Sequence, residues 1–214
     1  MPAIYLLRHG QASFGAEDYD VLSDLGARQA LVAGHELARR GARSPVVASG
    51  SLRRQRDTAT IAAAALGVPT ADIDTRWNEM HAHELVDDRL GAPGASAGLT
   101  STEFQGRLDE AMAQWIDSGD PAWHAFSDGA LQALTDLAAA IPRGRDAVVV
   151  TSSGVTAAVC GRLLGATSGG VIALNRVSIN ASITTITASP RGLSLVAFND
   201  HGHFLADRTL LTNR

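Results

Sequence analysis

Arginine, histidine and glycine stand side by side near the start of the chain, in the segment Arg8-His9-Gly10. The planar guanidinium group of an arginine donates a fork of hydrogen bonds that fits the oxygens of a phosphate. A neutral imidazole beside it is a competent nucleophile for phosphorus, and a glycine lets the backbone pass close to a ligand. The same residues would also fit an alternative interpretation, in which the arginine has a structural role and the histidine is simply buried at the end of a strand. The segment predicts a phosphate site with His9 as the nucleophile, but other parts of the chain must support it.

A second basic segment follows Ser51 and contains Arg53, Arg54 and Arg56. If Ser51 caps a helix here, the N-terminal amides and the helix dipole favour an anion. Arg54 is our candidate for a second phosphate-binding arginine. The other two are expected to be solvated or paired with acidic neighbours. An ordinary basic helix face is the alternative interpretation.

Short apolar runs lead into these polar segments and predict the strands that position them. Strands are expected at 3–7, 45–49 and 147–150, each followed by a helix, at 24–40, 52–66 and 155–164. A short strand is expected at 71–74, and two closing strands at 182–187 and 193–198, with a turn between them. This alternation predicts a mainly parallel sheet with helices on both faces and one antiparallel strand. The carboxyl ends of the strands would then meet at one crevice. The polar segments at these ends are Arg8-His9-Gly10, Ser49-Gly50-Ser51 and Thr151-Ser152-Ser153-Gly154.

The region from about 85 to 145 carries no motif that can be interpreted. Helices are expected at 102–117 and 126–140, residues 91–98 have the composition of a flexible stretch, and 165–170 has that of a loop. The whole chain, 1–214, is expected to form one domain in which 85–145 is a variable lid that selects the substrate.

Composition narrows the classes of function. The chain has 214 residues, of which 45% are hydrophobic and 19% charged, as in a globular protein. Its net charge of -4 gives no reason to expect a nucleic-acid or membrane partner. All 18 basic residues are arginine, so lysine chemistry is excluded, and a single cysteine excludes an internal disulfide. The first residues do not look like a signal peptide, so we expect a cytoplasmic protein. Its oligomeric state is open, and a homodimer is compatible with the sequence.

Three spaced segments together resemble the histidine phosphatase superfamily, which includes the cofactor-dependent phosphoglycerate mutases. They are Tyr5-Leu6-Leu7-Arg8-His9-Gly10-Gln11-Ala12-Ser13, Leu22-Ser23-Asp24-Leu25-Gly26-Ala27-Arg28-Gln29-Ala30 and Leu52-Arg53-Arg54-Gln55-Arg56-Asp57-Thr58-Ala59. The likeness covers residues 4 to about 66 and resumes at about 146–165. It implies a three-layer α/β/α sandwich like that of phosphoglycerate mutase, with an antiparallel edge strand.

The resemblance implies a reaction and a set of residues. His9 would attack the phosphoryl group and form a phosphohistidine, which water then hydrolyses. Arg8 and Arg54 would hold the phosphoryl oxygens and offset their charge, without a metal or another cofactor. Glu79 is the candidate general acid for the leaving group, and Glu84 is the second choice. Further phosphate or substrate contacts are expected from Gly10, Gln11, Ser13, Ser152 and Ser153.

One departure from the family pattern concerns its second histidine. Family members usually carry it at the end of a late strand, where this chain has Ser152. A serine hydroxyl donates one hydrogen bond but brings no charge, and losing a donor of this kind costs about 2.7–4 kcal/mol in comparable sites. Ser152 and the amides of the following helix could hold the phosphate instead, or His201 or His203 could fill the gap. Alternatively, the protein could bind a phosphorylated ligand with little turnover. Family members often have an asparagine several residues after Gly10, and this chain lacks it there. Asn180 is a weaker candidate for a contact in the pocket.

Two further interpretations of the sequence are a metal site and a phosphomutase. His81 and His83 would share one face of a strand and could bind a metal together, but no further ligand set supports this, so no metal is predicted. A phosphomutase is a third functional option, without a sequence feature that would hold a bisphosphorylated cofactor. The sequence thus predicts a hydrolase of a small phosphorylated substrate.

Overall fold

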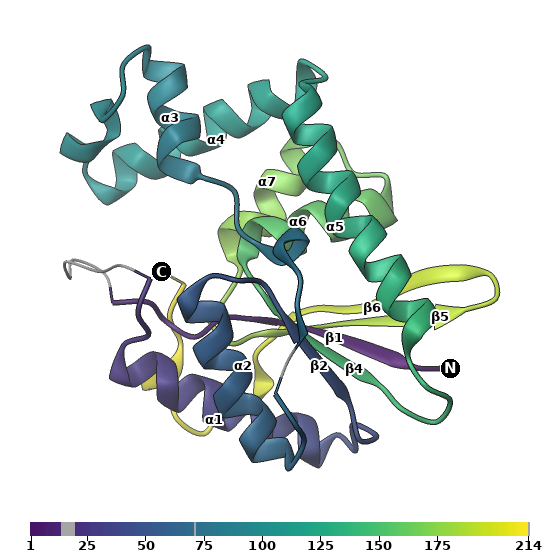
Figure 1. Ribbon diagram of the computed structural model, residues 1–214. Coiled ribbons are helices and arrows are strands. Elements are labelled where there is room, and N and C mark those ends of the chain that lie inside the picture. Colours follow the sequence, from purple (N-terminus) through teal and green to yellow (C-terminus); the bar gives the residue numbers. More distant parts are fainter. Residues whose placement is uncertain (14–19, 71, 214) are drawn as a thin grey trace.

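The computed structural model of the protein describes residues 1–13, 20–70 and 72–213 (Figure 1). Its centre is a six-stranded sheet in the order β3-β2-β4-β1-β5-β6. The first four of these strands run parallel, and β5 is antiparallel to both β1 and β6. The predicted mainly parallel sheet is therefore confirmed. The antiparallel strand β5 is not at the edge of the sheet, because β6 pairs with it on the outer side. The strands are β1 (Ala3–Arg8), β2 (Val46–Ser49), β3 (Asp72–Ile73), β4 (Ala147–Thr151), β5 (Ile183–Ser189) and β6 (Gly192–Asp200).

Helices cover both faces of this sheet and complete the predicted three layers. Helices α1 (Asp24–Arg39) and α2 (Arg53–Leu66) lie on one face, and α5 (Pro121–Ala140) and α6 (Ser153–Leu164) on the other (Figure 1). Successive side chains of a strand point to opposite faces, so Leu7 packs with the first pair of helices and Leu6 with the second. Both leucines are fully buried. The central strand thus has no polar face, which explains its continuous apolar run.

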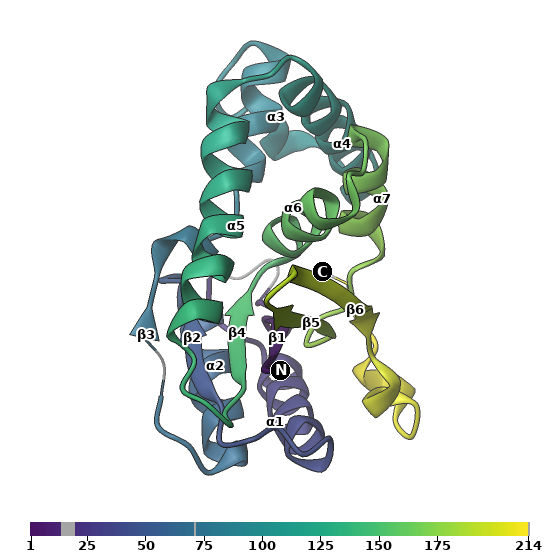
Figure 2. The ribbon, with the colours of Figure 1, turned by 90° about the vertical axis from the view of Figure 1, so that its right-hand side faces the viewer.

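A group of helices, here called the helical cap, lies beyond the carboxyl ends of the parallel strands (Figures 1 and 2). It consists of α3 (Ala82–Leu90), α4 (Ser101–Asp117) and α7 (Ser168–Val177). Its own apolar cluster includes Val86, Met112 and Trp123. Trp123 comes from the start of α5, whereas Leu134, further along α5, packs against the sheet. The second half of α5 therefore belongs to the sandwich, although the sequence places it in the lid. Short 3-10 turns occur at Thr75–Trp77, Ala95–Gly98, Gly202–Phe204 and Arg208–Leu210.

Several predicted boundaries were wrong for identifiable physical reasons. Helix α5 begins at Pro121, where Asp120 caps it, because a proline suits the first turn of a helix. Helices α3 and α7 were not predicted, and α7 begins inside the supposed 165–170 loop because Gly165 alone ends the preceding helix. Ser51 does not cap α2. Asp20 accepts a hydrogen bond from the Arg53 amide at 2.7 Å, so a carboxylate from a distant loop caps this helix.

No helix in the described part of the chain is long and apolar enough to cross a membrane.

Candidate active site

Arg8-His9-Gly10 forms a turn that the surrounding backbone holds from several sides. The His9 amide donates to the Thr151 carbonyl at 2.9 Å, which joins the ends of β1 and β4. The His9 carbonyl accepts from the Ala181 amide at 3.3 Å and from Asn180 Nδ2 at 3.4 Å. The Gly10 amide donates to Thr58 Oγ1 at 3.1 Å. The turn is therefore tied to β4, α2 and the segment before β5.

Gly10 is required by the close approach of helix α1. A Cβ atom on Gly10 would lie 2.3 Å from the carbonyl oxygen of Gly26, in the first turn of that helix. This is far closer than van der Waals contact, so any other residue would push the helix away from the turn.

The hydrogen bonds of the His9 ring define its tautomer. Nδ1 lies 2.7 Å from the Gly10 carbonyl oxygen, which can only accept, so Nδ1 carries the proton. Arg54 donates from Nε to His9 Nε2 at 3.2 Å, which requires a lone pair there. Burial and the charges of Arg8 and Arg54 hold the pKa of His9 well below its usual range, although the hydrogen bond to Gly10 acts in the opposite direction. Both hydrogen bonds fit a neutral ring whose Nε2 lone pair faces Arg54.

The charged groups of Arg8 and Arg54 both act on this imidazole. Arg8 donates through Nη1 to the Ser178 carbonyl at 2.6 Å, and Arg54 donates through Nη1 to Asp20 at 2.6 Å. Both side chains are about 9% exposed, and together with His9 they line a cavity of about 860 Å³. The structure thus brings together the three residues predicted to bind and attack a phosphoryl group.

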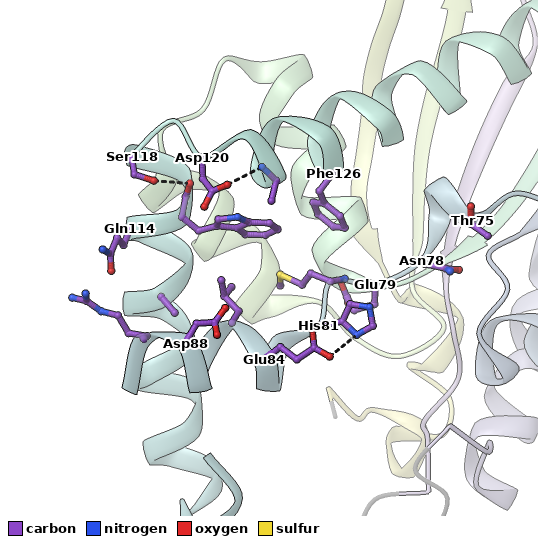
Figure 3. Close-up of a pocket in the computed structure, with 16 residues that line it drawn as sticks. Thr75, Asn78, Glu79, His81, Glu84, Asp88, Gln114, Ser118, Asp120 and Phe126 are labelled. Atoms are coloured by element: carbon purple, nitrogen blue, oxygen red, sulfur yellow. Dashed lines mark hydrogen bonds and ion pairs between the residues drawn. The ribbon is translucent and has the colours of Figure 1, made fainter. Parts of the chain in front are cut away.

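Glu79 lies in the wall of the same cavity, beside the first turn of α6. Its Oε2 accepts from the Gly154 amide at 3.1 Å and lies 3.4 Å from Ser153 Oγ. A Cβ atom on Gly154 would lie 2.3 Å from Glu79 Oε1, so the glycine makes room for the carboxylate. Glu79 also lines an adjoining cavity of about 750 Å³, shown in Figure 3. The carboxylate lies where the two cavities meet.

Glu84, the second candidate acid, lies on the first turn of α3. Figure 3 shows its carboxylate turned toward His81, and the two groups are 3.7 Å apart. The Glu84 side chain is 76% exposed. It lines both cavities from the exposed end of the helix.

Ser152 lies behind the cavity wall rather than in it. Its side chain is fully buried, and its hydroxyl accepts from Gln55 Nε2 at 2.9 Å. Among the described residues that line the cavity, its neighbour Ser153 is present and Ser152 is not. One of the amides of the following helix that were expected to hold phosphate, that of Gly154, donates to Glu79.

Five other candidates do not line either cavity in the described part of the chain, and each has a contact elsewhere. Gln11 accepts from the hydroxyl of Ser23, the N-cap of α1, and the Ser13 amide donates to the Val21 carbonyl. Asn180 is fully buried and supports the His9 carbonyl. His203 lies 3.1 Å from the Ala181 carbonyl through Nε2, and His201 contacts the Asn199 carbonyl. Both histidine rings are thus bound to backbone carbonyls outside the two cavities.

A buried amide network that sequence reasoning missed supports the turn. Gln29 Oε1 accepts from the Gln11 amide at 2.8 Å, and Gln29 Nε2 donates to Thr212 Oγ1 at 2.8 Å. Thr212 Oγ1 in turn donates to Asn180 Oδ1 at 2.9 Å. The network links α1, the C-terminal segment and the His9 turn. Gln29 lies within a segment that carries the family resemblance, and this resemblance was the signal that could have pointed to it. No comparable signal in the sequence points to Thr212.

His81 and His83 do not form a metal site of the kind considered from the sequence. They stand at the start of a helix rather than on a strand, so residues two apart do not share a face. His83 lies 3.1 Å from Ser96 Oγ and packs against the Phe104 ring. The described residues contain no group of three histidine, cysteine or acidic side chains that could hold a metal.

Comparison with known families shows which family the chain belongs to. The model of the histidine phosphatase superfamily (branch 1) matches residues 4–201, and the chain belongs to this family. A bifunctional protein of Mycobacterium tuberculosis, Rv2228c, is 30% identical over 164 residues, which are 73% of this chain. An uncharacterized protein of Mycobacterium bovis matches equally well. The chain spans 40% of the length of these relatives.

Solved structures share the fold at lower identity. Phosphoserine phosphatase from Entamoeba histolytica, in complex with 3-phosphoglyceric acid, superposes with a TM-score of 0.67 at 20% identity, covering 96% of this chain and all of that one. Mycobacterial glucosyl-3-phosphoglycerate phosphatase gives 0.63 at 24% identity, with 93% and 99% covered. Phosphoglycerate mutase from Bacillus anthracis gives 0.62 at 16% identity, with 94% of each chain covered. These likenesses confirm the phosphoglycerate mutase-like fold.

Proposed function

We propose that this protein hydrolyses a small phosphomonoester through a phosphohistidine formed on His9. The observation that carries the proposal is the orientation of the His9 ring. The ring donates from Nδ1 to the Gly10 carbonyl, and its Nε2 lone pair accepts from Arg54 in the wall of a large cavity. Membership of the histidine phosphatase superfamily, and the phosphatases that share the fold, support the same reaction class.

In the first step, His9 Nε2 attacks phosphorus and the bond between phosphorus and the ester oxygen breaks. Arg8 and Arg54 balance the charge on the phosphoryl oxygens. Arg54 already contacts the attacking nitrogen, so it would stay beside the phosphoryl group when the new bond forms. Glu79 donates a proton to the leaving oxygen, which departs as an alcohol.

In the second step, water attacks the phosphorus of the phosphohistidine and gives its proton to Glu79. Inorganic phosphate leaves and the His9 lone pair is restored. The same carboxyl group thus acts as an acid and then as a base, and its place in the cavity wall beside Ser153 suits both roles. The arginines supply the positive charge, so the scheme has no step that needs a metal.

A phospholigand-binding protein with weak turnover is the second candidate function. The observation that favours it is the burial of Ser152, whose hydroxyl binds Gln55 behind the cavity. From the sequence, we expect Ser152 at the position of the family's second histidine. The phosphoryl group would then lack one donor that the family usually provides. A mutase reaction has less support, because it would need a bound phosphorylated cofactor.

Trapping the intermediate separates these functions. Rapid acid-free quenching after mixing with a ³²P-labelled phosphomonoester should label the wild-type protein with an acid-labile, base-stable phosphate. His9→Ala should abolish both the label and turnover of p-nitrophenyl phosphate, by a factor of about 10⁴ or more, because the reaction passes through this atom. His203→Ala serves as a matched control and should keep the label. Binding of inorganic phosphate without any label or turnover would favour the binding protein.

A further inference from the structure

The carbonyl oxygen of Trp77, two residues before Glu79, accepts two buried hydrogen bonds. Gln55 of α2 donates to it from Nε2 at 2.9 Å, and Thr151 at the end of β4 donates from Oγ1 at 2.7 Å. Both donor side chains are fully buried, and the Trp77 ring lies in the apolar cluster that the sheet shares with α5. A carbonyl oxygen has two lone pairs, so these bonds use its whole capacity. The chain is therefore fixed at this point from two sides.

The amide of Gln55 is used through its nitrogen and not through its oxygen. Nε2 donates to the Trp77 carbonyl and also to Ser152 Oγ, at 2.9 Å in both cases. Because a carbonyl can only accept, the bond to Trp77 fixes which end of the amide faces it. Oε1 is buried and has no partner among the described residues, and a Cβ atom on Gly50 would lie 2.0 Å from it. An apolar side chain of the same length would avoid this unsatisfied oxygen. What the amide adds at this position is therefore its two hydrogen bonds.

Side-chain bonds also hold the two residues that follow Trp77. Asn78 Oδ1 accepts from the Ser51 amide at 2.7 Å, and Asn78 Nδ2 donates to Ser51 Oγ at 2.9 Å. Glu79 Oε2 accepts from the Gly154 amide at 3.1 Å. Three consecutive residues are thus bound to α2 and β4, to the turn before α2, and to the first turn of α6. This continuous set of contacts places the Glu79 carboxylate in the cavity wall.

We propose that Gln55 and Thr151 are positioning residues for the general acid, which they hold in place through the Trp77 backbone. This inference rests on the proposed function, in which Glu79 protonates the leaving oxygen. Neither side chain lines a cavity in the described part of the chain, so both act through Trp77. When either bond is removed, the carbonyl is released and Glu79 shifts away from the leaving oxygen. Attack by the imidazole of His9 does not depend on these two bonds.

Two esters with different leaving groups give a readout that a general structural defect does not move. The leaving oxygen of glycerol 2-phosphate needs a proton, whereas p-nitrophenolate leaves unprotonated. Gln55→Met keeps the length of the side chain and removes both donors. We expect kcat/KM to fall about 10- to 100-fold for glycerol 2-phosphate, as for a displacement of about 1 Å, and less than about threefold for p-nitrophenyl phosphate. The measured quantity is the ratio of the two kcat/KM values.

Thr151→Val and Thr151→Ser form a matched pair for the second bond. Valine has the shape of threonine without the hydroxyl, so Thr151→Val should change the ratio in the same direction as Gln55→Met. Thr151→Ser keeps the hydroxyl and should keep the wild-type ratio. Thr184→Val is the control for stability, because it removes another buried threonine hydroxyl, on β5, which accepts from the Asn199 amide at 3.0 Å. Any loss in Thr184→Val should be equal for both esters.

A double-mutant cycle tests whether the effect passes through Glu79. In a Glu79→Gln background, Gln55→Met and Thr151→Val should cause no further loss for glycerol 2-phosphate, because the acid that they position is already absent. Losses that add in full would overturn the proposal, as would equal losses for the two esters in the single variants. If Gln55→Met does not fold, the two Thr151 variants and their cycle decide in the same way.

Failure of the proposed function would be recognised separately. A protein that turns over neither ester would contradict the hydrolase, and a protein that turns over only p-nitrophenyl phosphate would leave it standing. In both cases the position of Glu79 is measured by the Gly154 amide signal in ¹H–¹⁵N NMR spectra, because that amide donates to Glu79. Thr151→Val should shift this signal in the wild-type background and not in Glu79→Ala, where the acceptor is gone. Equal shifts in the two backgrounds, or no shift in either, would overturn the positioning role.

Discussion

The strand ends and the helical cap line the same cavity, but they are built in different ways. At the strand ends, His9 and Arg54 are almost fully buried, and hydrogen bonds from three other elements hold the His9 turn. In the cap, Arg176 of α7, His81 and Glu84 are exposed. Arg176 pairs with Asp109 of α4, whereas His81 and Glu84 pair within the first turn of α3. The first region is fixed before a ligand arrives, whereas the second presents side chains to it.

The difference suggests that the two regions bind different parts of the substrate. A phosphoryl group is the same in every substrate, so its site gains from preorganised donors in a buried setting. The rest of the substrate differs from one enzyme to another, and its contacts come from the cap. Variants at the strand ends should therefore affect all phosphomonoesters, while variants in the cap should change the preference among them. Glu79 and Gly154 lie between the strand ends and the helical cap, so variants of these two residues test whether the two regions have different roles.

Glu79→Gln should have the larger effect on turnover. The amide keeps the shape of the side chain but cannot deliver a proton, and general acid catalysis typically contributes about 10²- to 10⁴-fold. We expect a loss of this size in kcat/KM for an alkyl phosphate, whose leaving oxygen needs the proton. The loss in kcat/KM should be much smaller for p-nitrophenyl phosphate, because p-nitrophenolate leaves unprotonated. The contrast is measured in kcat/KM, which reports the first step, because kcat also includes the second step, in which Glu79 is the base for either ester.

Glu84→Gln is the matched control, because it changes a carboxylate in the same cavity wall. It should leave kcat for both esters within about twofold of the wild-type value. A loss in Glu84→Gln that depends on the leaving group, together with an active Glu79→Gln, would transfer the acid role to Glu84.

Gly154→Ala should have a smaller but still general effect. The added Cβ would lie 2.3 Å from Glu79 Oε1, so the carboxylate must move out of its place beside α6. Because a displacement of about 1 Å can cost 10²-fold, we expect kcat to fall about 10- to 100-fold for alkyl phosphates, whether or not they carry a carboxylate. Gly106→Ala in α4 is the cap counterpart, since its Cβ would meet open space. It should keep full activity and raise the free energy of unfolding by about 0.5–1 kcal/mol.

Equal activity of Gly154→Ala and wild-type protein would show that the position of Glu79 at the boundary does not matter for turnover. Chemical denaturation of both alanine variants would separate a catalytic loss from a folding defect.

The sequence predicted the strand ends better than the cap, for a physical reason. Continuous apolar runs such as Ala3–Leu7 can be satisfied only inside a sheet, and the polar residues that follow them must then meet at one edge. Arg8, His9 and Arg54 could therefore be placed together from pattern alone. The cap has weaker signals. Helix α3 has only nine residues and a single buried position, Val86, so no apolar face was recognisable.

Contacts between distant segments could not be predicted from local patterns. Asp20 caps α2 from a loop more than 30 residues earlier, and nothing in the sequence near Ser51 indicates this. Similarly, Ser152 is found behind the cavity because Gln55, almost 100 residues away, turns its amide toward it. Nothing near Arg176 in the sequence indicates its partner Asp109, which lies 67 residues earlier on α4. Such pairings depend on tertiary packing, and one sequence does not reveal them.

The buried region should also dominate the response of stability to mild acid. The pKa values of His9 and His203 are lowered from the usual 6.5, in each case mainly by burial. In the unfolded chain both rings take up protons near pH 6.5, whereas the folded protein excludes them until lower pH. The unfolded state therefore binds more protons in this window, and the free energy of unfolding falls as pH falls below 6.5. This stabilising contribution is fully present above pH 6.5.

Carboxylates contribute in a separate, more acidic window. The pKa of Glu36 is lowered to about 2, chiefly by its hydrogen bonds to arginine, so its stabilisation is lost only as pH falls below its usual value near 4.5. Urea unfolding at intervals between pH 7 and pH 5.5 thus reports on the histidines. His203→Gln keeps a donor for the Ala181 carbonyl and removes the titration, so its unfolding free energy should depend less steeply on pH than that of the wild type. Identical slopes would mean that His203 titrates alike in both states, which would leave His9 as the source of any acid sensitivity.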